Sequence, residues 1–190
     1  MRRILNVILY LLTLCILLGF VLNFSQKTEC DLESLILQDN MMPPQWERLW
    51  RVLPPALPKD GAQDALEVIY ENQNEMASHT IYRYKNGLLA FLLLRINNEI
   101  FFPSGLRIWS QFEGSDYWLL NEDEDRIQCG DSDDPLLGYR CDAVVRYGPY
   151  ISEFSSPIEE GIMGQEEFKA IVFAIDERIA SCIQSPNHRR

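Results

Sequence analysis

Near its start this chain carries 23 consecutive residues without a charged side chain, residues 4–26. Isoleucine, leucine, valine and phenylalanine dominate the stretch, which as an α-helix would span roughly the 30 Å of a bilayer's hydrocarbon core. Arg2 and Arg3 precede it, and the positive-inside tendency keeps such a flank in the cytoplasm. The sequence therefore predicts a single-pass transmembrane signal-anchor at residues 1–26 and an extracytoplasmic domain at residues 27–190 of the cell envelope.

A cleaved secretory signal is the alternative for the same stretch. Such signals have a shorter apolar region of about 7 to 15 residues and small residues ahead of the cleavage site. Here the apolar run is longer, and only Asn23 and Ser25 offer a poor cleavage site near its end. A retained anchor is the favoured prediction, while removal of the stretch stays open.

The residues beyond the stretch, roughly 160 of them, suffice for one ordinary domain with its own core. A hydrophobic content of 47% and an aromatic content of 11% indicate that the chain folds. With Arg2 and Arg3 set aside, 15 basic residues stand against 28 acidic ones. Such a surface repels phosphate backbones, which argues against nucleic acid and leaves cationic or neutral partners.

The cysteines point to the same compartment. Cys15 falls within the apolar stretch, and the other four form an even set, as expected where disulfides persist: Cys30, Cys129, Cys141 and Cys182. We predict a bond between Cys129 and Cys141, which closes a short loop, and one between Cys30 and Cys182, which joins the start of the domain to its last helix. Buried free thiols and a zinc site are the alternatives, and the wide ligand spacing disfavours zinc.

The first part of the domain is predicted to be helical and irregular. Residues 31–38 favour a short helix, and the proline-rich stretch that follows, up to residue 59, favours an irregular arm. Asp60 is placed as a helix N-cap, and apolar residues at helical spacing predict a helix up to residue 72. Those residues are Ala62, Ala65, Leu66 and Ile69.

The second part is predicted to be mostly strands. Residues 79–85 alternate in polarity and favour a strand, whereas residues 86–102 favour a helix capped by Asn86, with a fully covered strand as the alternative. Short strands are predicted at residues 106–112, 116–120, 127–129, 139–146 and 150–154, with a hairpin turn at 147–149. Residues 165–182 form an amphipathic helix. Together these elements predict an α+β fold, in which an antiparallel sheet of about four to six strands is covered by two or three helices.

An acidic run between residues 121 and 134 is the most unusual local feature. Its carboxylates are candidate ligands for a hard cation such as Ca²⁺, which takes six to eight oxygens. The candidates are Glu122, Asp123, Asp125, Asp131 and Asp133. A solvated acidic loop is the favoured interpretation, because the glycine and terminal glutamate of an EF-hand are missing.

Aromatic residues and one histidine are weaker candidates for a site. Trp109, Phe112, Tyr117 and Trp118 are close in sequence and could line a ligand site, but alternation along short strands favours packing. His79 lies on a predicted strand, where a structural role is favoured over general-base catalysis.

Several short motifs occur in a set order along the chain. They are residues 42–46 (Met-Pro-Pro-Gln-Trp), 61–62 (Gly-Ala), 81–84 (Ile-Tyr-Arg-Tyr), Cys129 and Cys141, 147–151 (Tyr-Gly-Pro-Tyr-Ile) and 174–176 (Ala-Ile-Asp). The order resembles that of uncharacterised bacterial membrane-anchored extracytoplasmic domains, similar in plan to the extracellular sensor domains of some membrane kinases. The resemblance implies a sensor-like domain over most of residues 30–182 and brings no catalytic residue with it.

These observations predict a non-enzymatic module that binds a small ligand or an envelope protein near the membrane. The sequence holds no Gly-x-Ser-x-Gly elbow, no phosphate-binding glycine loop and no His-Glu-x-x-His pair. The alternative is a metal-dependent hydrolase that uses the acidic run at residues 122–134. The two differ in one structural respect, because the hydrolase needs those carboxylates to converge on a cleft.

Overall fold

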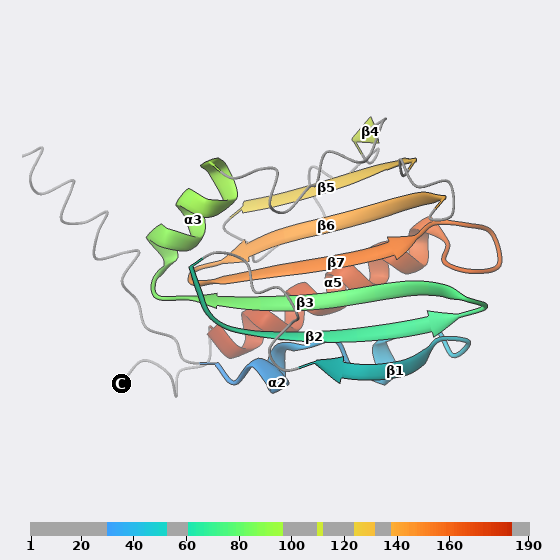
Figure 1. Cartoon of the computed structure of the whole chain (residues 1–190), viewed down its shortest axis with the longest axis horizontal. Helices are drawn as coiled ribbons and strands as arrows, with labels where there is room; N and C mark the ends of the chain where they lie inside the picture. The colour runs from blue at the N-terminus through green and yellow to red at the C-terminus, as the bar shows by residue number, and fades with distance from the viewer. Residues whose placement is uncertain (1–29, 53–60, 97–109, 112–123, 132–137, 184–190) are drawn as a thin grey trace, which may run out of the picture.

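A computed structural model describes residues 30–52, 61–96, 110–111, 124–131 and 138–183. Within these ranges the chain forms one antiparallel sheet of seven strands, in the order β1-β2-β3-β7-β6-β5-β4 (Figure 1). The strands are β1 Glu47–Val52, β2 Ala62–Asn72, β3 Glu75–Tyr84, β4 Ser110–Gln111, β5 Glu124–Asp131, β6 Tyr139–Tyr147 and β7 Tyr150–Pro157. The pairing of β3 with β7 joins the first three strands to the last four.

Four helical segments accompany the sheet in the described ranges. They are α2 Leu32–Leu35, the 3-10 helix η1 Asp39–Met41, α3 Gly87–Ile96 and α5 Gln165–Ile183. The side chain of Asn86 accepts a hydrogen bond from the Leu89 N–H at 2.9 Å and so caps α3. At the start of α5, the Glu167 carboxylate accepts a 2.8 Å hydrogen bond from the Gly164 N–H, as in a capping box.

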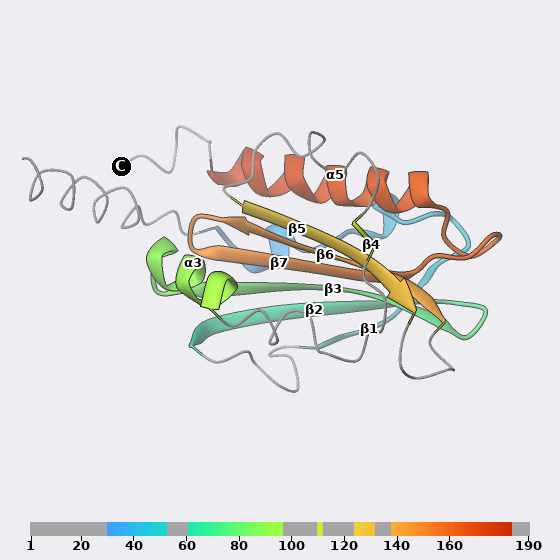
Figure 2. The ribbon, with the colours of Figure 1, turned by 90° about the horizontal axis from the view of Figure 1, so that it is seen from above.

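The main core lies between the sheet and α5, which runs across one face of it (Figure 2). Five apolar residues of α5 recur at helical spacing and are all buried: Phe168, Ile171, Val172, Ile175 and Ile179. The Phe168 ring packs against Phe154 of β7, with 5.3 Å between ring centroids. This face of the sheet is called the helix face below, and its core holds α5 and α2 in place.

A second, smaller cluster lies on the opposite face, at one end of the sheet. There α3 buries Ala90 and Leu94 against Tyr82, Tyr84 and Ile151 of the central strands. Figure 2 shows α3 and α5 on opposite sides of the sheet. The sheet is therefore a central layer with a long helix on one side and a short helix over one end of the other side.

Both predicted cysteine pairs are disulfides in the structure. Cys30 bonds to Cys182 with a Cα–Cα distance of 6.2 Å, which ties the entry of the domain to the last turn of α5. Cys129 bonds to Cys141 with a Cα–Cα distance of 4.1 Å. These two residues are directly paired across β5 and β6, so the bond closes the hairpin that the two strands form.

The helix predicted up to residue 72 is wrong, because this segment forms β2, the longest strand. Burial alternates along it, with Leu66, Val68 and Tyr70 buried in the main core and the residues between them less buried. A period of two is the signature of a strand, whereas the apolar residues at helical spacing end up on both faces of the sheet. Branched and aromatic residues at positions 68–70 also favour a strand.

The predicted irregular arm is wrong in part, because Glu47–Val52 forms the edge strand β1. Its pairing with β2 shifts by one residue between Arg48 and Trp50, so that Leu49 is an extra residue in the ladder, as in a β-bulge. Leu49 is 43% exposed. The prolines of this stretch all lie outside the strand in the sequence.

The other elements agree with the sequence where the structure describes them. The structure confirms strand 79–85, the two strands around the 147–149 turn and the closing helix. The helix predicted at residues 86–102 is confirmed as α3, Gly87–Ile96, and its remaining residues lie outside the described ranges. Gly148 has a positive φ of 57° and is followed by a proline, which fits a type II′ hairpin turn. Of the predicted strands at 106–112 and 116–120, the structure describes only Ser110–Gln111, which form β4.

The α+β class and the antiparallel sheet are thus as predicted, with one strand more than the expected maximum of six. The predicted anchor, residues 4–26, lies outside the described residues. None of the helices that the structure describes has both the length and the apolar character needed to cross a membrane.

Candidate functional site

His79 lies at the centre of the helix face and is completely buried. Its Nδ1 accepts a hydrogen bond from the Leu37 N–H at 2.9 Å, and its Nε2 lies 2.9 Å from the Ser152 hydroxyl. Because a backbone N–H can only donate, the proton of the neutral ring sits on Nε2, which therefore donates to Ser152. A general base needs the opposite arrangement, in which Nε2 accepts the serine proton.

Burial, together with the nearby charge of Arg178, lowers the pKa of His79 to about 3. The ring is therefore neutral at physiological pH. Held between a backbone donor and a buried serine, it links β3 and β7 to the segment that follows α2. This arrangement fits the structural role that the sequence favoured for His79.

Leu37 is fixed to the sheet through both of its backbone groups. Its N–H is bound by His79, and its carbonyl oxygen accepts a 3.0 Å hydrogen bond from the Tyr70 hydroxyl. Arg48 donates to that hydroxyl at 3.2 Å and forms a 2.6 Å ion pair with Asp39. Burial raises the pKa of Tyr70 to about 12, so it stays a neutral donor. These polar contacts position the chain around Leu37.

The face of the sheet opposite α5 is more polar than the helix face, and we call it the polar face. It is formed by the residues that alternate with the main core along the central strands: Glu67, Ser78, Thr80, Tyr82, Arg140, Asp142, Glu153 and Ser155. One cross-strand row on this face contains Glu67 of β2, Thr80 of β3 and Glu153 of β7, which are direct register partners. The two glutamates stand two strand spacings apart, about 10 Å.

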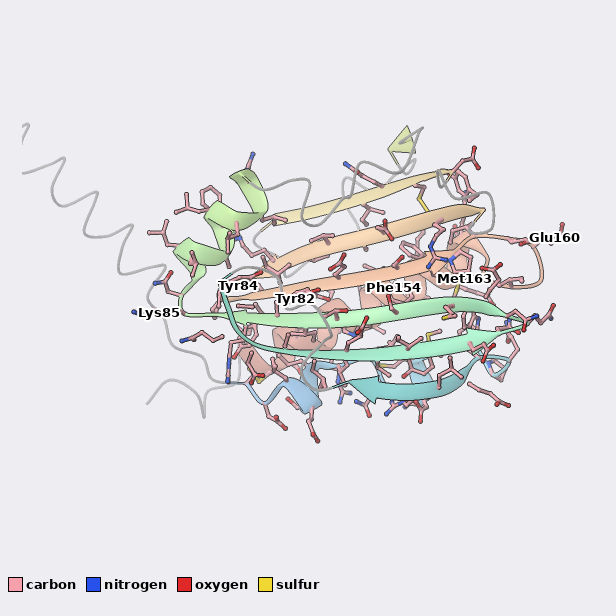
Figure 3. The ribbon with its side chains drawn as sticks, in the orientation of Figure 1. Tyr82, Tyr84, Lys85, Phe154, Glu160 and Met163 are labelled. Carbon is pink, nitrogen blue, oxygen red and sulfur yellow. A yellow bond between two sulfur atoms is a disulfide. The ribbon has the colours of Figure 1, made fainter. Side chains whose placement is uncertain are left out.

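Tyr82 stands beside this row, at the edge of the cluster that packs on α3 (Figure 3). Its hydroxyl donates to the Glu153 carboxylate at 3.3 Å. Burial and the charge of Glu153 raise the pKa of Tyr82 above its usual value, so the hydroxyl remains a donor. Glu153 is thus oriented by a tyrosine that cannot itself carry charge at physiological pH.

Among these polar groups, the Glu67 carboxylate has the least stabilisation from neighbouring side chains. Its side chain is half-buried, and burial raises the pKa of its carboxyl group. Among the residues that the structure describes, none forms a hydrogen bond or an ion pair with this carboxylate. A partly desolvated carboxylate without a partner is a site where a bound cation or hydrogen-bond donor is stabilising.

Arg140 marks the other end of the polar face. Its guanidinium group donates to the Met76 carbonyl oxygen at 2.9 Å and to the Ser155 hydroxyl at 3.3 Å. Burial lowers its pKa, which nevertheless stays far above neutral pH for a guanidinium group. The positive charge of Arg140 is thus held near β3 and β7, away from the row that contains Glu67.

The carboxylates that the sequence offers as candidate calcium ligands are not brought together where they can be located. Asp125 and Asp131 both belong to β5, six residues apart, which separates them by about 20 Å along the strand. One ion cannot bind both. Glu122, Asp123 and Asp133 lie outside the described residues, and within the described ranges no group of three or more acidic, histidine or cysteine side chains is placed to bind a metal.

The aromatic candidates Trp109, Phe112, Tyr117 and Trp118 also lie outside the described residues. The polar row itself was missed from the sequence. The sequence predicts a helix around Glu67, which hides its position opposite Thr80, and it indicates for Glu153 only a place in a strand. The signal that would have found them is the polar side of the alternation in β2, β3 and β7.

No protein-family model matches this chain, and comparison with curated proteins and with solved structures finds no significant match. Its site must therefore be interpreted from its own residues.

Proposed function

We propose that this protein is a non-enzymatic binding module, exposed outside the cytoplasm and held at a membrane by residues 4–26, that binds an organic cation on the polar face. The ligand class is an amine or guanidinium group, free or on a protein partner. The observation that carries the proposal is the half-buried Glu67 carboxylate, which has no partner among the described residues and faces Glu153 across one strand.

The chemistry of this row favours a cation over an anion or an apolar ligand. The backbones of Glu67 and Glu153 lie two strand spacings apart, about 10 Å, a distance that an extended diamine or a lysine side chain can bridge. The charge of such a ligand would offset the cost of keeping Glu67 partly out of water. Thr80, between the two glutamates, adds a hydroxyl in the same row.

Two further observations support an extracytoplasmic binding role. The disulfides use all four cysteines beyond the apolar stretch, which fits an oxidising compartment. The buried histidine holds its proton on the nitrogen that faces Ser152, and this does not fit serine activation.

Isothermal titration of the full chain in lipid nanodiscs with spermidine tests the proposal. We expect saturable binding, weakened roughly tenfold or more by Glu67→Gln, because a charge-assisted hydrogen bond is lost. Glu160→Gln is the matched control, since it removes the same charge from an exposed loop residue, and its affinity should stay within about twofold. Absence of saturable binding, or equal weakening by both substitutions, would contradict a site at Glu67.

A further inference from the structure

One end of the sheet brings together the start of the domain and α3. The backbone N–H of Cys30 donates to the Tyr150 hydroxyl at 2.7 Å, and Tyr150 is the first residue of β7. At the same end the Tyr84 N–H donates to the Pro149 carbonyl oxygen at 2.9 Å, and α3 begins three residues after Tyr84. We call this the Cys30 end. Figure 1 shows α3 at this end of the sheet.

The apolar stretch of the sequence finishes close to this end. Cys30 is four positions after residue 26, and four steps of extended chain reach at most about 14 Å. If residues 4–26 span a bilayer, as proposed above, the Cys30 end lies within that distance of the membrane surface. The helix α3 is then among the parts of the fold nearest to lipid.

The surface of α3 suits that position. The helix buries Ala90 and Leu94 against the sheet, yet it is apolar on its other sides as well, and Leu92 is 40% exposed. Soluble helices usually present polar residues on the side that faces water. An exposed leucine on a helix of this composition is stabilised by contact with another apolar phase.

Basic side chains lie on and beside α3. Lys85 and Arg95 are exposed just before and near the end of the helix. Two guanidinium groups lie near the ring of Phe91, with Arg95 at 5.8 Å and Arg146 at 5.5 Å from its centroid. Apolar residues interleaved with basic ones are the pattern of a segment that lies at a lipid headgroup surface.

The opposite end of the sheet carries acidic residues. They include Glu71, Glu75, Asp131, Glu159, Glu160, Glu166 and Glu167, at the ends of β2 and β5, at the start of β3, after β7 and at the start of α5. In Figure 3, Glu160 and Lys85 lie at opposite ends of the molecule. The Cys30 end also carries the exposed residues Asp31 and Glu33, so the attraction to an anionic surface comes from the basic residues at α3. Repulsion of the acidic end then favours the orientation in which α3 faces the lipid.

We infer that α3 rests on an anionic phospholipid bilayer, with Leu92 inserted among the acyl chains near the headgroups and Lys85 and Arg95 paired with lipid phosphates. This inference rests on the proposed anchor but not on the proposed cation site. It makes the domain upright on the membrane, with the Cys30 end down and the polar row of Glu67 raised above the surface. Each basic residue near such a surface favours contact by a factor of about five.

Paramagnetic broadening by spin-labelled lipid tests the contact. The full chain is placed in nanodiscs of phosphatidylglycerol that carry a nitroxide on the lipid tail, and the leucine methyl signals are recorded by NMR. Leu49 is the matched control, because it is as exposed as Leu92 but lies on the edge strand near the acidic end. We expect strong broadening at Leu92 and little at Leu49. Equal broadening, or stronger broadening at Leu49, would overturn the inference.

A charge reversal tests the electrostatic part. Lys85→Glu should reduce the broadening at Leu92 several-fold, whereas Lys169→Glu, the same change at the start of α5, should leave it unchanged. Equal effects of the two substitutions would overturn the pairing with lipid phosphates. A chain that fails to incorporate into nanodiscs would refute the anchor. Incorporation without broadening at Leu92 would refute only the contact of α3, and spermidine binding is measured independently of both.

Discussion

Removing the two disulfides should destabilise the protein by unequal amounts, because the loops that they close differ in length. The Cys30–Cys182 bond joins residues 152 positions apart, and the Cys129–Cys141 bond joins residues 12 apart. In the chain-entropy model the first restricts the unfolded chain by about 5 kcal/mol and the second by about 3 kcal/mol. The difference of about 2 kcal/mol is a measurable share of the roughly 5 to 15 kcal/mol that keeps a domain folded.

The assay is urea unfolding of the full chain with each pair changed to alanine. With a slope of about 2 kcal/mol per molar urea, the midpoint should fall by about 2.5 M without Cys30–Cys182 and by about 1.5 M without Cys129–Cys141. Alanine avoids placing a hydroxyl group in the core, where Cys129 and Cys141 are buried. Cys15→Ala is the control, since this residue is in neither bond, and its midpoint should not move.

Two results would refute this reasoning. Equal midpoint shifts for the two pairs, or a larger shift for the short loop, would show that restriction of the unfolded chain does not set the effect. Alkylation of all four cysteines without reductant, detected by mass spectrometry, would show that the bonds do not form. The second result would also remove the main support for an oxidising compartment.

Three other substitutions or conditions have defined outcomes. The pKa of His79 falls from 6.5 to about 3 on folding, so between these values the unfolded chain binds a proton that the native chain does not. The free energy of unfolding should therefore fall by up to about 1.4 kcal/mol per pH unit as the pH drops from 6.5 towards 3. In His79→Gln the urea midpoint should depend less steeply on pH. Phe168→Ala should cost about 3 to 5 kcal/mol in urea unfolding, because it removes the ring packed on Phe154 and leaves a cavity; a loss below about 1 kcal/mol would contradict that packing. Gly148→Ala should lower the free energy of unfolding by about 1 to 2 kcal/mol because of the positive φ, and Gly148→Asn by less, with equal losses counting against backbone strain as the cause.

The elements that could be predicted are those whose local signals agree with one another. In α5 the apolar spacing, the acidic first turn and the following proline all indicate the same helix, and the structure confirms it. The hairpin at Gly148 and the helix capped by Asn86 were likewise encoded in a few neighbouring residues. Such segments can be predicted without a structure because their local signals agree.

The error in β2 has a different origin. Its residues satisfy a helical spacing and an alternating one at the same time, and the choice between them depends on β1 and β3 on either side. Tertiary pairing of this kind cannot be deduced from one segment. The candidate site depends on the same pairing, since Glu67, Thr80 and Glu153 become neighbours only through register across three strands. The disulfides could be predicted from the sequence because an even set of four cysteines leaves few possible pairings.

The extra residue in β1 has a consequence for how copies of this protein behave when crowded. An edge strand exposes a row of unpaired N–H and C=O groups that can template the addition of a strand from another molecule. Chains held at one membrane, as we propose, meet each other at high effective concentration, which increases that hazard. At Leu49 the bulge breaks the regular spacing of the ladder, so an incoming strand loses its register within the six residues of β1. We expect the bulge to reduce aggregation through the edge strand β1.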